Sequence, residues 1–323
     1  MKTGNHSSKI AVVIPCYKVK KHILKVIKEI DSIVDLIIIV DDKCPEESGK
    51  YVEQKCSDFR IQVVYNETNK GVGSATITGY KTALKANADI IVKIDGDGQM
   101  DTSNIPKLIQ PILLKEADYT KGNRFYFLTE LKTMPNLRLI GNSILSMINK
   151  IVSGYWSITD PTNGFTAISK EILQLIPLEK IDSRYFFESD MLFRLSTSRA
   201  VIQDIPMHAR YGDEISSLSI WKVIFSFPLK YLKRFLKRLF YLYFLRDFNV
   251  GTLHLIFGSV FFIFGIIFGS VVWVNSIVEK SFASTGTVML SVLPIILGFQ
   301  MLLSFLSYDM QNQPQIPIRK INS

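Results

Sequence analysis

Residues 90–106 read IIVKIDGDGQMDTSNIP, a short apolar run that leads directly into two carboxylates. The run from Ile90 to Ile94 has the length and the β-branched composition of a buried strand. Similar runs occur at 10–15, 36–40 and 61–65, and helix-like stretches such as 20–30 and 72–86 lie between them. Strand and helix alternate, so the sequence predicts an α/β domain with a largely parallel sheet.

Polar and turn-forming residues follow each of these strands. They are Pro15, Asp41 with Asp42, the segment 69–73 and the segment 95–99. Ligands of open α/β sheets bind at the carboxyl ends of the strands. We therefore expect one binding site to draw on all of these segments.

The Asp95-Gly96-Asp97 tripeptide is the first indication of a metal. A small glycine lets two carboxylates approach one point, and hard oxygen ligands suit Mg²⁺ or Mn²⁺ when a diphosphate supplies the remaining oxygens. The same tripeptide is also an ordinary turn former, so by itself it leaves a plain turn as the alternative.

Two long apolar stretches, 252–274 and 287–308, contain no charged side chain. Each is long enough to cross the roughly 30 Å hydrocarbon core of a bilayer at about 1.5 Å per residue. The connection 275–286 is short, which suits two antiparallel spans. Buried core helices are the alternative explanation for such stretches.

The charge bias indicates an orientation. Segment 221–247 contains one acid, Asp247, among many basic residues, and Arg319 and Lys320 follow the second stretch. Under the positive-inside rule the soluble domain and both termini face the cytosol. Basic residues next to an anionic membrane leaflet account for much of the net charge of +9. No nucleic-acid partner is therefore expected.

Basic and apolar residues recur at helical spacing in the region 219–247, which predicts an amphipathic helix lying in the membrane interface. We expect its cations to face membrane lipids and to hold the active site at headgroup height. These cations are Lys230, Lys233, Arg234, Lys237 and Arg238.

In its motifs the chain resembles glycosyltransferases of family 2 with the GT-A fold, in the branch of dolichyl-phosphate mannose synthases and bacterial polyprenyl-phosphate sugar transferases. The motifs occur in the family's order: VVIPCY (12–17), IIVDDKCPEES (38–48), NKGVGSATITGYKTA (69–83), DGDGQMDTSNIP (95–106), KGNRF (121–125), DPTNGF (160–165), FFESDML (186–192) and RYGDEISSL (210–218). The resemblance implies a Rossmann-like GT-A catalytic domain at 1–218, followed by the interfacial helix at 219–247, two transmembrane helices within 248–310 and a cytosolic tail at 311–323.

The resemblance also implies site residues. Asp95, Asp97 and Gln99 fall on the positions that hold the family's Mg²⁺ or Mn²⁺. Asp41 or Asp42 is expected to bind the base or ribose of a nucleotide-sugar donor, although a turn or helix cap is the alternative for Asp42. The other donor-side and acceptor-side positions are Pro15, Tyr17, Lys70, Gly71, Asp160, Glu188 and Asp190, and the phosphate-binding arginines are Arg124, Arg138 and Arg210. Among all of these, Asp97, Arg124 and Arg210 are the expected catalytic residues.

The acceptor in this branch is a polyprenyl phosphate. Its phosphate is largely dianionic at neutral pH, so inverting transfer of one sugar to it needs no strong general base. The nearest alternative is a glycosyltransferase that acts on a hydroxyl of a glycolipid or polysaccharide, with Glu188 or Asp190 as the base. A catalytically silent membrane scaffold is the alternative from another class.

The chain departs from the family pattern at a few places. Lys18-Val19 and Lys43-Cys44 replace the usual Asn-Glu and Gly-Ser, and Thr166 stands where many relatives have arginine. The choice between a UDP-sugar and a GDP-sugar therefore stays open. Small residues in the apolar stretches, such as Gly258 and Gly265, allow close helix packing within the chain or in a homo-oligomer.

Overall fold

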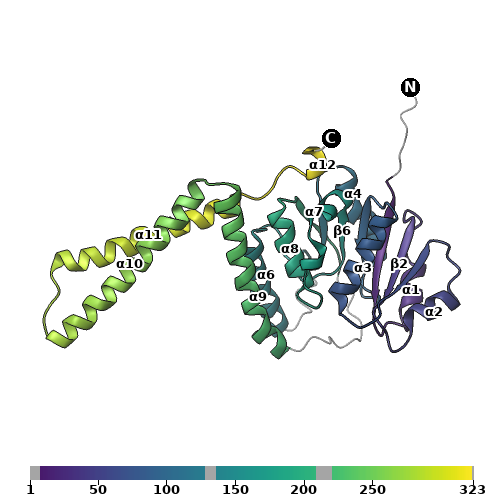
Figure 1. Ribbon diagram of the computed structural model, residues 1–323, viewed down its shortest axis with the longest axis horizontal. Helices are drawn as coiled ribbons and strands as arrows, with labels where there is room; N and C mark the ends of the chain where they lie inside the picture. The colour runs from purple at the N-terminus through teal and green to yellow at the C-terminus, as the bar shows by residue number, and fades with distance from the viewer. Residues whose placement is uncertain (1–7, 128–135, 209–219, 322–323) are drawn as a thin grey trace, which may run out of the picture. The chain divides into compact units, whose positions relative to one another are not determined.

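The computed structural model describes residues 8–127, 136–208 and 220–321 (Figure 1). The chain forms two compact units. The globular unit comprises Met1–Phe235 and Pro314–Ser323, and the hairpin unit comprises Leu236–Gln313. The chain thus leaves the globular unit once, passes through the hairpin and returns.

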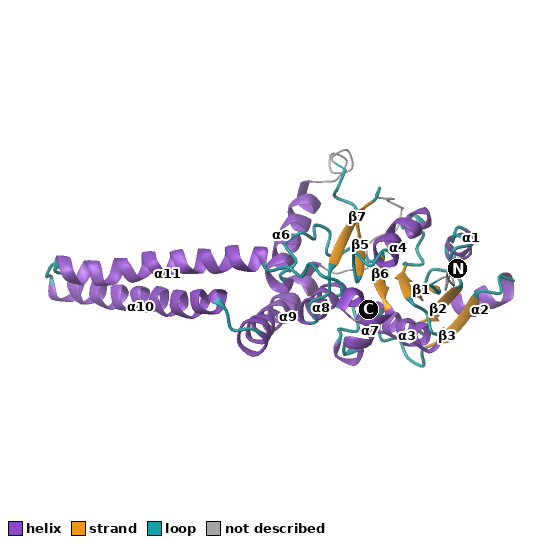
Figure 2. Cartoon of the chain, turned by 90° about the horizontal axis from the view of Figure 1, so that it is seen from above, coloured by secondary structure: helices purple, strands orange, loops and turns teal. Residues whose placement is uncertain are grey.

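Seven strands form one sheet in the globular unit, in the order β3-β2-β1-β4-β6-β5-β7 (Figure 2). The strands are β1 (Ile10–Cys16), β2 (Leu36–Asp41), β3 (Ile61–Tyr65), β4 (Ile90–Lys93), β5 (Tyr119–Asn123), β6 (Thr166–Ser169) and β7 (Ile202–Pro206). Strands β1 to β4 pair in parallel, as do β5 and β7, whereas β6 is antiparallel to both β4 and β5. The predicted α/β fold with a largely parallel sheet is confirmed.

Helices cover both faces of this sheet, because its central strands are apolar on both sides. Along β1, Val12 and Ile14 belong to one core cluster, and Ala11 and Val13 belong to the other. The first core is covered by α1 (Ile23–Lys28), α2 (Ser48–Lys55) and α4 (Ile105–Leu113), and the second by α3 (Val72–Lys85), α7 (Lys170–Leu175) and α8 (Phe187–Thr197). Short 3₁₀ turns occupy Thr102–Asn104 and Leu178–Lys180, and α6 is Asn136–Ser153.

The sheet topology brings separate motifs to one edge. Parallel strands β1, β2 and β4 all end there, at Cys16, Asp41 and Lys93. Because β6 runs the other way, its first residue, Thr166, pairs with Lys93, and Lys121 of β5 pairs with Thr166. The predicted metal motif and the turns and loops predicted to bind donor and acceptor therefore share this edge.

The hairpin unit contains α10 (Val250–Glu279) and α11 (Thr285–Gln311), both long and apolar enough to cross a membrane. Glycines let the two backbones touch: a Cβ added at Gly298 would lie 2.5 Å from the amide nitrogen of Phe262, and one at Gly258 would lie 3.1 Å from that of Leu302. The predicted small-residue packing thus occurs within one chain. It leaves the prediction of a homo-oligomer untested.

Helix α9 (Ile220–Phe240) begins in the globular unit and ends in the hairpin unit, and one π-helical turn at Tyr241–Arg246 follows it. Its cations do not lie as the sequence predicted. Lys230 pairs with Asp182 at 2.5 Å and Arg234 with Asp190 at 2.6 Å. Only Lys233 and Lys237 of the five predicted lipid-facing cations are exposed.

The fifth cation, Arg238, is buried within the hairpin unit. Its guanidinium grips Asp309 through two bonds of 2.6 and 3.1 Å, and the hydroxyl of Tyr243 donates to the same carboxylate at 2.6 Å. The prediction of a five-cation lipid surface is therefore wrong for Lys230, Arg234 and Arg238. Helical spacing places these three residues on one face, and that face is turned toward protein carboxylates.

The exposed face of α9 is instead mainly apolar. It carries Leu229, Leu232, Leu236 and Phe240, each more than half exposed, with Lys233 and Lys237 among them. This is the pattern of an interfacial helix with two lysines whose ammonium groups can reach the headgroups.

The end of the chain docks on the globular unit through the short helix α12 (Ile318–Ile321). Ile318 is 8% exposed and belongs to the second core, and its amide donates to both oxygens of the fully buried Asp118 at 2.9 and 3.1 Å. Arg319 reaches Glu171 at 3.2 Å and the carbonyl of Ile112. Most of the predicted tail therefore belongs to the globular unit, and Ile318 packs in its core.

Ile318→Ala should destabilise the globular unit, because it removes a buried side chain from the core. We expect a loss of about 2 to 4 kcal/mol, seen as a lower melting temperature in detergent. Ile321→Ala, in the same helix but 68% exposed, is the matched control and should stay within about 0.5 kcal/mol of the parent protein. Equal melting temperatures for the two variants would show that the docked tail adds no stability.

Candidate active site

The metal motif lies where β4 ends. Asp95 and Asp97 are partly exposed, and the Asp97 Oδ1 accepts the amide of Gln99 at 3.0 Å, which fixes the turn. Gly96 is required for packing, since a Cβ there would lie 3.1 Å from Val19 and 3.3 Å from Ile14. The glycine therefore lets the turn lie against the core.

Two carboxylates are what the protein offers a metal here. In the described ranges no group of three or more His, Cys, Asp or Glu side chains could hold a metal ion. Mg²⁺ and Mn²⁺ commonly take one or two protein carboxylates and complete their shell with substrate phosphates and water. Asp95 and Asp97 fit such an ion if a diphosphate accompanies it, and Gln99 lies in the same turn.

A buried cation lies behind the motif. Lys93 of β4 is 1% exposed, and its ammonium lies 2.8 Å from the Asp95 Oδ1 and 3.4 Å from the Glu188 Oε1. Burial lowers the pKa of Lys93, but the two carboxylates outweigh this and raise the pKa above its ordinary value. Lys93 was not predicted as a site residue, because it lies within a strand that is otherwise apolar.

The two aspartates after β2 are both engaged inside the protein. Asp41 accepts the amides of Cys44 and Gly49 at 2.7 and 2.8 Å, which holds the turn into α2. Asp42 accepts the amides of Lys70 and Gly71 at 3.2 and 2.8 Å. Asp41 therefore stabilises the turn into α2, whereas Asp42 connects the end of β2 to the glycine-rich turn at Lys70 and Gly71.

That glycine-rich turn needs its glycine. Gly71 has a φ of +98°, and a Cβ there would lie 2.8 Å from the carbonyl oxygen of Ser183. The predicted donor-side residues Asp42, Lys70 and Gly71 are thus brought together, and they abut the segment that precedes α8.

The two segments that depart from the family pattern on the predicted donor side, Lys18-Val19 and Lys43-Cys44, contact each other. The Lys18 amide donates to the Cys44 Sγ at 3.1 Å, and Lys18 and Lys43 both have a positive φ. Next to them Pro15 is buried in β1, and Tyr17 is 46% exposed at its end. The replaced residues thus form one connected corner of the site.

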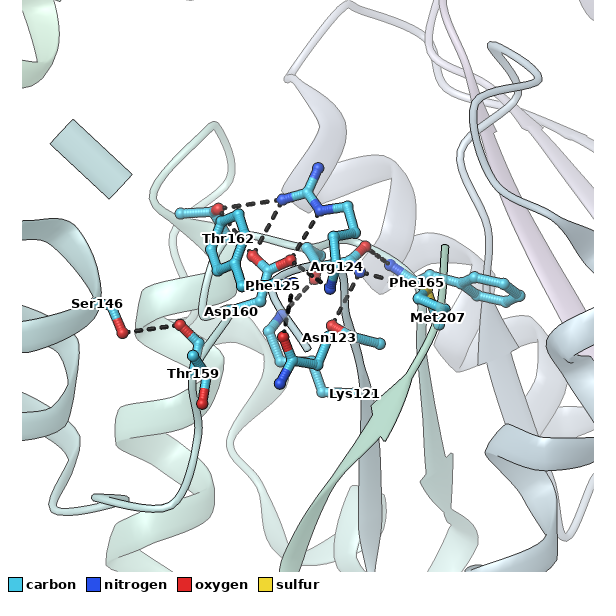
Figure 3. Close-up of polar contacts among 12 residues, drawn as sticks. Lys121, Asn123, Arg124, Phe125, Ser146, Thr159, Asp160, Thr162, Phe165 and Met207 are labelled. Carbon is cyan, nitrogen blue, oxygen red and sulfur yellow. Dashed lines mark hydrogen bonds and ion pairs between the residues drawn. The ribbon is translucent and has the colours of Figure 1, made fainter. Parts of the chain in front are cut away.

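On the acceptor side, Arg124 and Asp160 form a fixed pair (Figure 3). The Arg124 Nε and Nη2 donate to the two oxygens of the fully buried Asp160 at 2.7 and 3.0 Å. Thr162 also donates to this carboxylate, at 3.3 Å. Asp160 thereby sets the orientation of the guanidinium of Arg124, whose side chain is 30% exposed.

The loop that carries Asp160 is anchored from below. Buried Lys121 donates its ammonium to the carbonyl of Asn163, and burial lowers the pKa of Lys121 to about 8. Asp204 accepts the amide of Thr159 at 2.8 Å and the side-chain amide of Asn123 at 3.1 Å. Strands β5 and β7 therefore hold this loop in place.

The two predicted carboxylates of α8 differ in their surroundings. Glu188 is 16% exposed and contacts Lys93. Asp190 is fully buried, accepts the Asp182 amide at 2.8 Å and is gripped by Arg234 through both oxygens. Asp190 therefore serves as an internal anchor for α9. The predictions for Arg210 and for the side chain of Arg138 lie outside the described part of the chain.

A pocket of about 400 Å³ lies beside the Arg124 and Asp160 pair. Its walls come from α6 and from the neighbours of the pair, Phe125 and Thr159. They combine polar and apolar side chains: Asn142, Ser143, Ser146 and Lys150 with Leu139 and Met147. The sequence analysis did not predict this pocket, which arises from tertiary packing of α6.

The sequence profile of glycosyl transferase family 2 matches residues 11–176, which is half of the chain. This chain belongs to glycosyl transferase family 2. Its motif resemblance is thereby confirmed, and the protein is a glycosyltransferase.

Relatives of this family 2 enzyme include lipid-phosphate sugar transferases. The UDP-N-acetylglucosamine–dolichyl-phosphate N-acetylglucosaminyltransferase of Methanococcus voltae is 32% identical over 242 residues, which cover 71% of this chain and 96% of the relative. The undecaprenyl-phosphate mannosyltransferase of Micrococcus luteus is 28% identical, with 53% of this chain and 70% of the relative covered.

A solved structure confirms the GT-A type of fold. Glucosyl-3-phosphoglycerate synthase from Mycobacterium tuberculosis, in complex with Mn²⁺, UDP and glucosyl-3-phosphoglycerate, superimposes with a TM-score of 0.53 at 19% identity. The match covers 72% of this glycosyltransferase and 80% of that chain.

Asp204→Asn should flatten part of the enzyme's pH dependence of stability. Burial raises the pKa of Asp204 to about 6, so the folded state holds a proton that the unfolded state releases near pH 4. The proton on Asp204 therefore favours the folded state fully below about pH 4, and its contribution to the free energy of unfolding is lost as pH rises to about 6. The variant's melting temperature relative to the parent should therefore rise between these pH values.

Asp58→Asn is a control of opposite sign. The hydrogen bond from Arg60 lowers the pKa of Asp58, so that carboxylate stabilises the fold at neutral pH and stops doing so in acid. Its variant should lose melting temperature at pH 7 and approach the parent as pH falls. The same pH trend in both variants would contradict the assignment for Asp204.

Proposed function

We propose that this glycosyltransferase moves one sugar from a nucleotide-diphosphate sugar to a polyprenyl phosphate, with inversion at the anomeric carbon and with Mg²⁺ or Mn²⁺ bound at Asp95 and Asp97. The relatives named above use such lipid phosphates and support the acceptor class. The observation that carries the proposal is the state of the acceptor-side carboxylates: Glu188 contacts buried Lys93, and Asp190 is buried under Arg234.

A hydroxyl acceptor needs a base to take its proton. Both carboxylates already face a cation of the chain, and Asp190 is fully buried, which supports an acceptor that needs no base. A phosphate acceptor loses no proton as it attacks, because its second pKa is near 6. One of its oxygens forms the new bond to the anomeric carbon. The bond from that carbon to the donor diphosphate breaks, and the electron pair leaves with the nucleotide diphosphate.

The acceptor side offers suitable contacts for a phosphate on an apolar chain. Arg124, whose Nε and Nη2 are held by Asp160, brings a fixed positive charge that suits a phosphate oxygen. The neighbouring pocket adds Lys150, hydroxyls and an amide, and Leu139 and Met147 supply apolar surface. Such a mixed lining fits a headgroup with the first part of a lipid.

On the donor side, a bound divalent cation supplies charge neutralisation on the departing nucleotide diphosphate. Asp95 and Asp97 are the residues that would hold it, with Gln99 in the same turn. The exposed ring of Tyr17 and the Asp42 turn border the place expected for the nucleoside. The sugar and the base of the donor stay open between UDP-sugars and GDP-sugars.

For localisation, we propose that α10 and α11 span the membrane and that the catalytic unit and both termini face the cytosol. The excess of basic residues at the end of α9 supports this orientation. The exposed apolar face of α9 would then lie in the interface, where the phosphate of a polyprenyl lipid is found.

The first test is transfer by purified protein in detergent from a panel of UDP- and GDP-sugars to polyprenyl phosphate, with Mn²⁺ or EDTA, read by mass of the lipid product. We expect an acid-labile lipid phosphodiester that forms with Mn²⁺ and not with EDTA. An acid-stable glycoside would support the hydroxyl-acceptor alternative. If the protein binds neither donor nor metal, the result would support the alternative of a catalytically silent membrane scaffold.

In this assay Asp97→Ala should lower the rate by about 10²- to 10³-fold or more, because charge on the leaving group loses its stabilisation. The control is Asp101→Ala, since Asp101 lies four residues on and caps the turn at Thr102–Asn104. Both variants should insert in membranes like the parent. Near-normal transfer by Asp97→Ala would remove Asp97 from the metal site.

The double variant Lys233→Gln with Lys237→Gln tests the interfacial face of α9. Each lysine near an anionic leaflet is worth about 1 kcal/mol, so loss of both should raise the KM for polyprenyl phosphate in anionic vesicles by about 30-fold. The donor KM and the KM for acceptor in neutral vesicles should stay unchanged. Acceptor KM values that match the parent in both kinds of vesicle would exclude this lipid contact.

A further inference from the structure

Lys93 is the most unusual side chain of the catalytic edge. It lies inside β4 between its strand neighbours Val13 and Thr166 and is 1% exposed. A charged group in such a place is costly unless partners satisfy it. Its ammonium can donate three hydrogen bonds.

All of its partners belong to the site. The Lys93 Nζ lies 2.8 Å from the Asp95 Oδ1, 3.3 Å from the carbonyl oxygen of Gly164 and 3.4 Å from the Glu188 Oε1. One ammonium therefore joins the metal motif, the acceptor-side loop and helix α8. These three segments are far apart in the sequence.

The space around this contact is closed. A Cβ added at Gly164 would lie 2.5 Å from the Lys93 Nζ and 2.7 Å from the Asp95 Oδ2. Even alanine at position 164 would push the ammonium or the carboxylate out of place. The glycine of the acceptor-side motif is thus fitted to the pair formed by Lys93 and Asp95.

We propose that Lys93 is a positioning residue for the metal site. It holds the Asp95 carboxylate by Oδ1 and so restricts the orientations in which that carboxylate could hold a cation. It also compensates the charge of Glu188, which would otherwise face Asp95 across the same small space. The inference rests on the metal-dependent transfer proposed above and assigns it a residue outside the family motifs quoted for this chain.

The chain offers a matched control in Lys121. Both lysines are buried in neighbouring parts of the sheet, and both donate to a carbonyl of the same loop, Gly164 for Lys93 and Asn163 for Lys121. In the described residues, no hydrogen bond joins Lys121 to a carboxylate of the metal motif. Removal of either ammonium disturbs the core in a similar way, but removal of Lys93 alone releases Asp95.

The test measures Mn²⁺ affinity by electron paramagnetic resonance on the full-length protein in detergent with UDP present. Lys93→Met should weaken Mn²⁺ binding by about 10- to 100-fold, the usual effect of losing a group that orients a metal ligand. Lys121→Met should stay within about threefold of the parent. Equal affinities for Lys93→Met and the parent, or equal losses in both variants, would overturn the proposal.

Lys93→Met leaves two carboxylates without their cation, which endangers the fold. The double variant Lys93→Met with Glu188→Gln removes one charge of each sign and keeps the volume, and thermal unfolding verifies that it is folded. It should show the same weakened Mn²⁺ affinity, because the Asp95 carboxylate still lacks the hydrogen bond from Lys93. Parent-like affinity in this folded variant would also overturn the proposal.

This measurement is independent of the acceptor. If the parent binds Mn²⁺ with UDP and Lys93→Met does not, the positioning role stands even when no lipid product forms in the transfer assay. If lipid product forms and the two proteins bind Mn²⁺ equally, the proposed function stands and the role of Lys93 fails.

Discussion

A buried charge must be paired, and in this protein that constraint determines how distant segments are joined. Several fully or nearly buried ionic groups form pairs at junctions between elements: Lys93, Asp160, Asp190, Arg238 and Asp309. An unpaired charge in such a place costs several kcal/mol, so each pair admits few alternative arrangements of its two segments. The apolar cores make the fold compact, and the buried pairs specify which loop meets which.

The same constraint accounts for the orientation of α9. A basic helix beside a membrane can use its cations on lipid phosphates or on its own protein. Here residues spaced by four, Lys230 and Arg234, meet carboxylates of the globular unit, and Arg238 meets Asp309 of the hairpin unit. The opposite face is left apolar and holds two lysines. Such a helix can lie in the interface by hydrophobic burial, with charge as a supplement.

Much of the fold could be predicted from local patterns. The strand Ile61–Tyr65 matches its predicted limits, and helix Val72–Lys85 ends one residue before its predicted end. Both C-terminal helices extend a few residues beyond the predicted apolar stretches, because polar residues such as Ser276 and Glu279 continue α10. The antiparallel strand β6 was not predicted, since its four residues carry little periodicity and its pairing depends on β4 and β5.

The site was predictable as a set of motifs but not as a set of contacts. The segments of Asp42 and Gly71, and those of Arg124 and Asp160, were each expected near a ligand, and the structure brings each pair together. Which oxygen faces inward depends on tertiary geometry, as Asp41 and Asp190 illustrate. The partners of Lys93 lie up to 95 residues away, and the tail reaches Asp118 across 200 residues. Sequence spacing carries no information on such contacts.

The proposal of a phosphate acceptor rests on how the carboxylates of the site are paired. In a hydroxyl-directed enzyme the base must keep a carboxylate near the acceptor with a free oxygen and little opposing positive charge. In this protein Asp160, Glu188 and Asp190 each face an arginine or lysine of the chain. A site of this kind favours an acceptor that brings its own negative charge, and a phosphate monoester is such an acceptor.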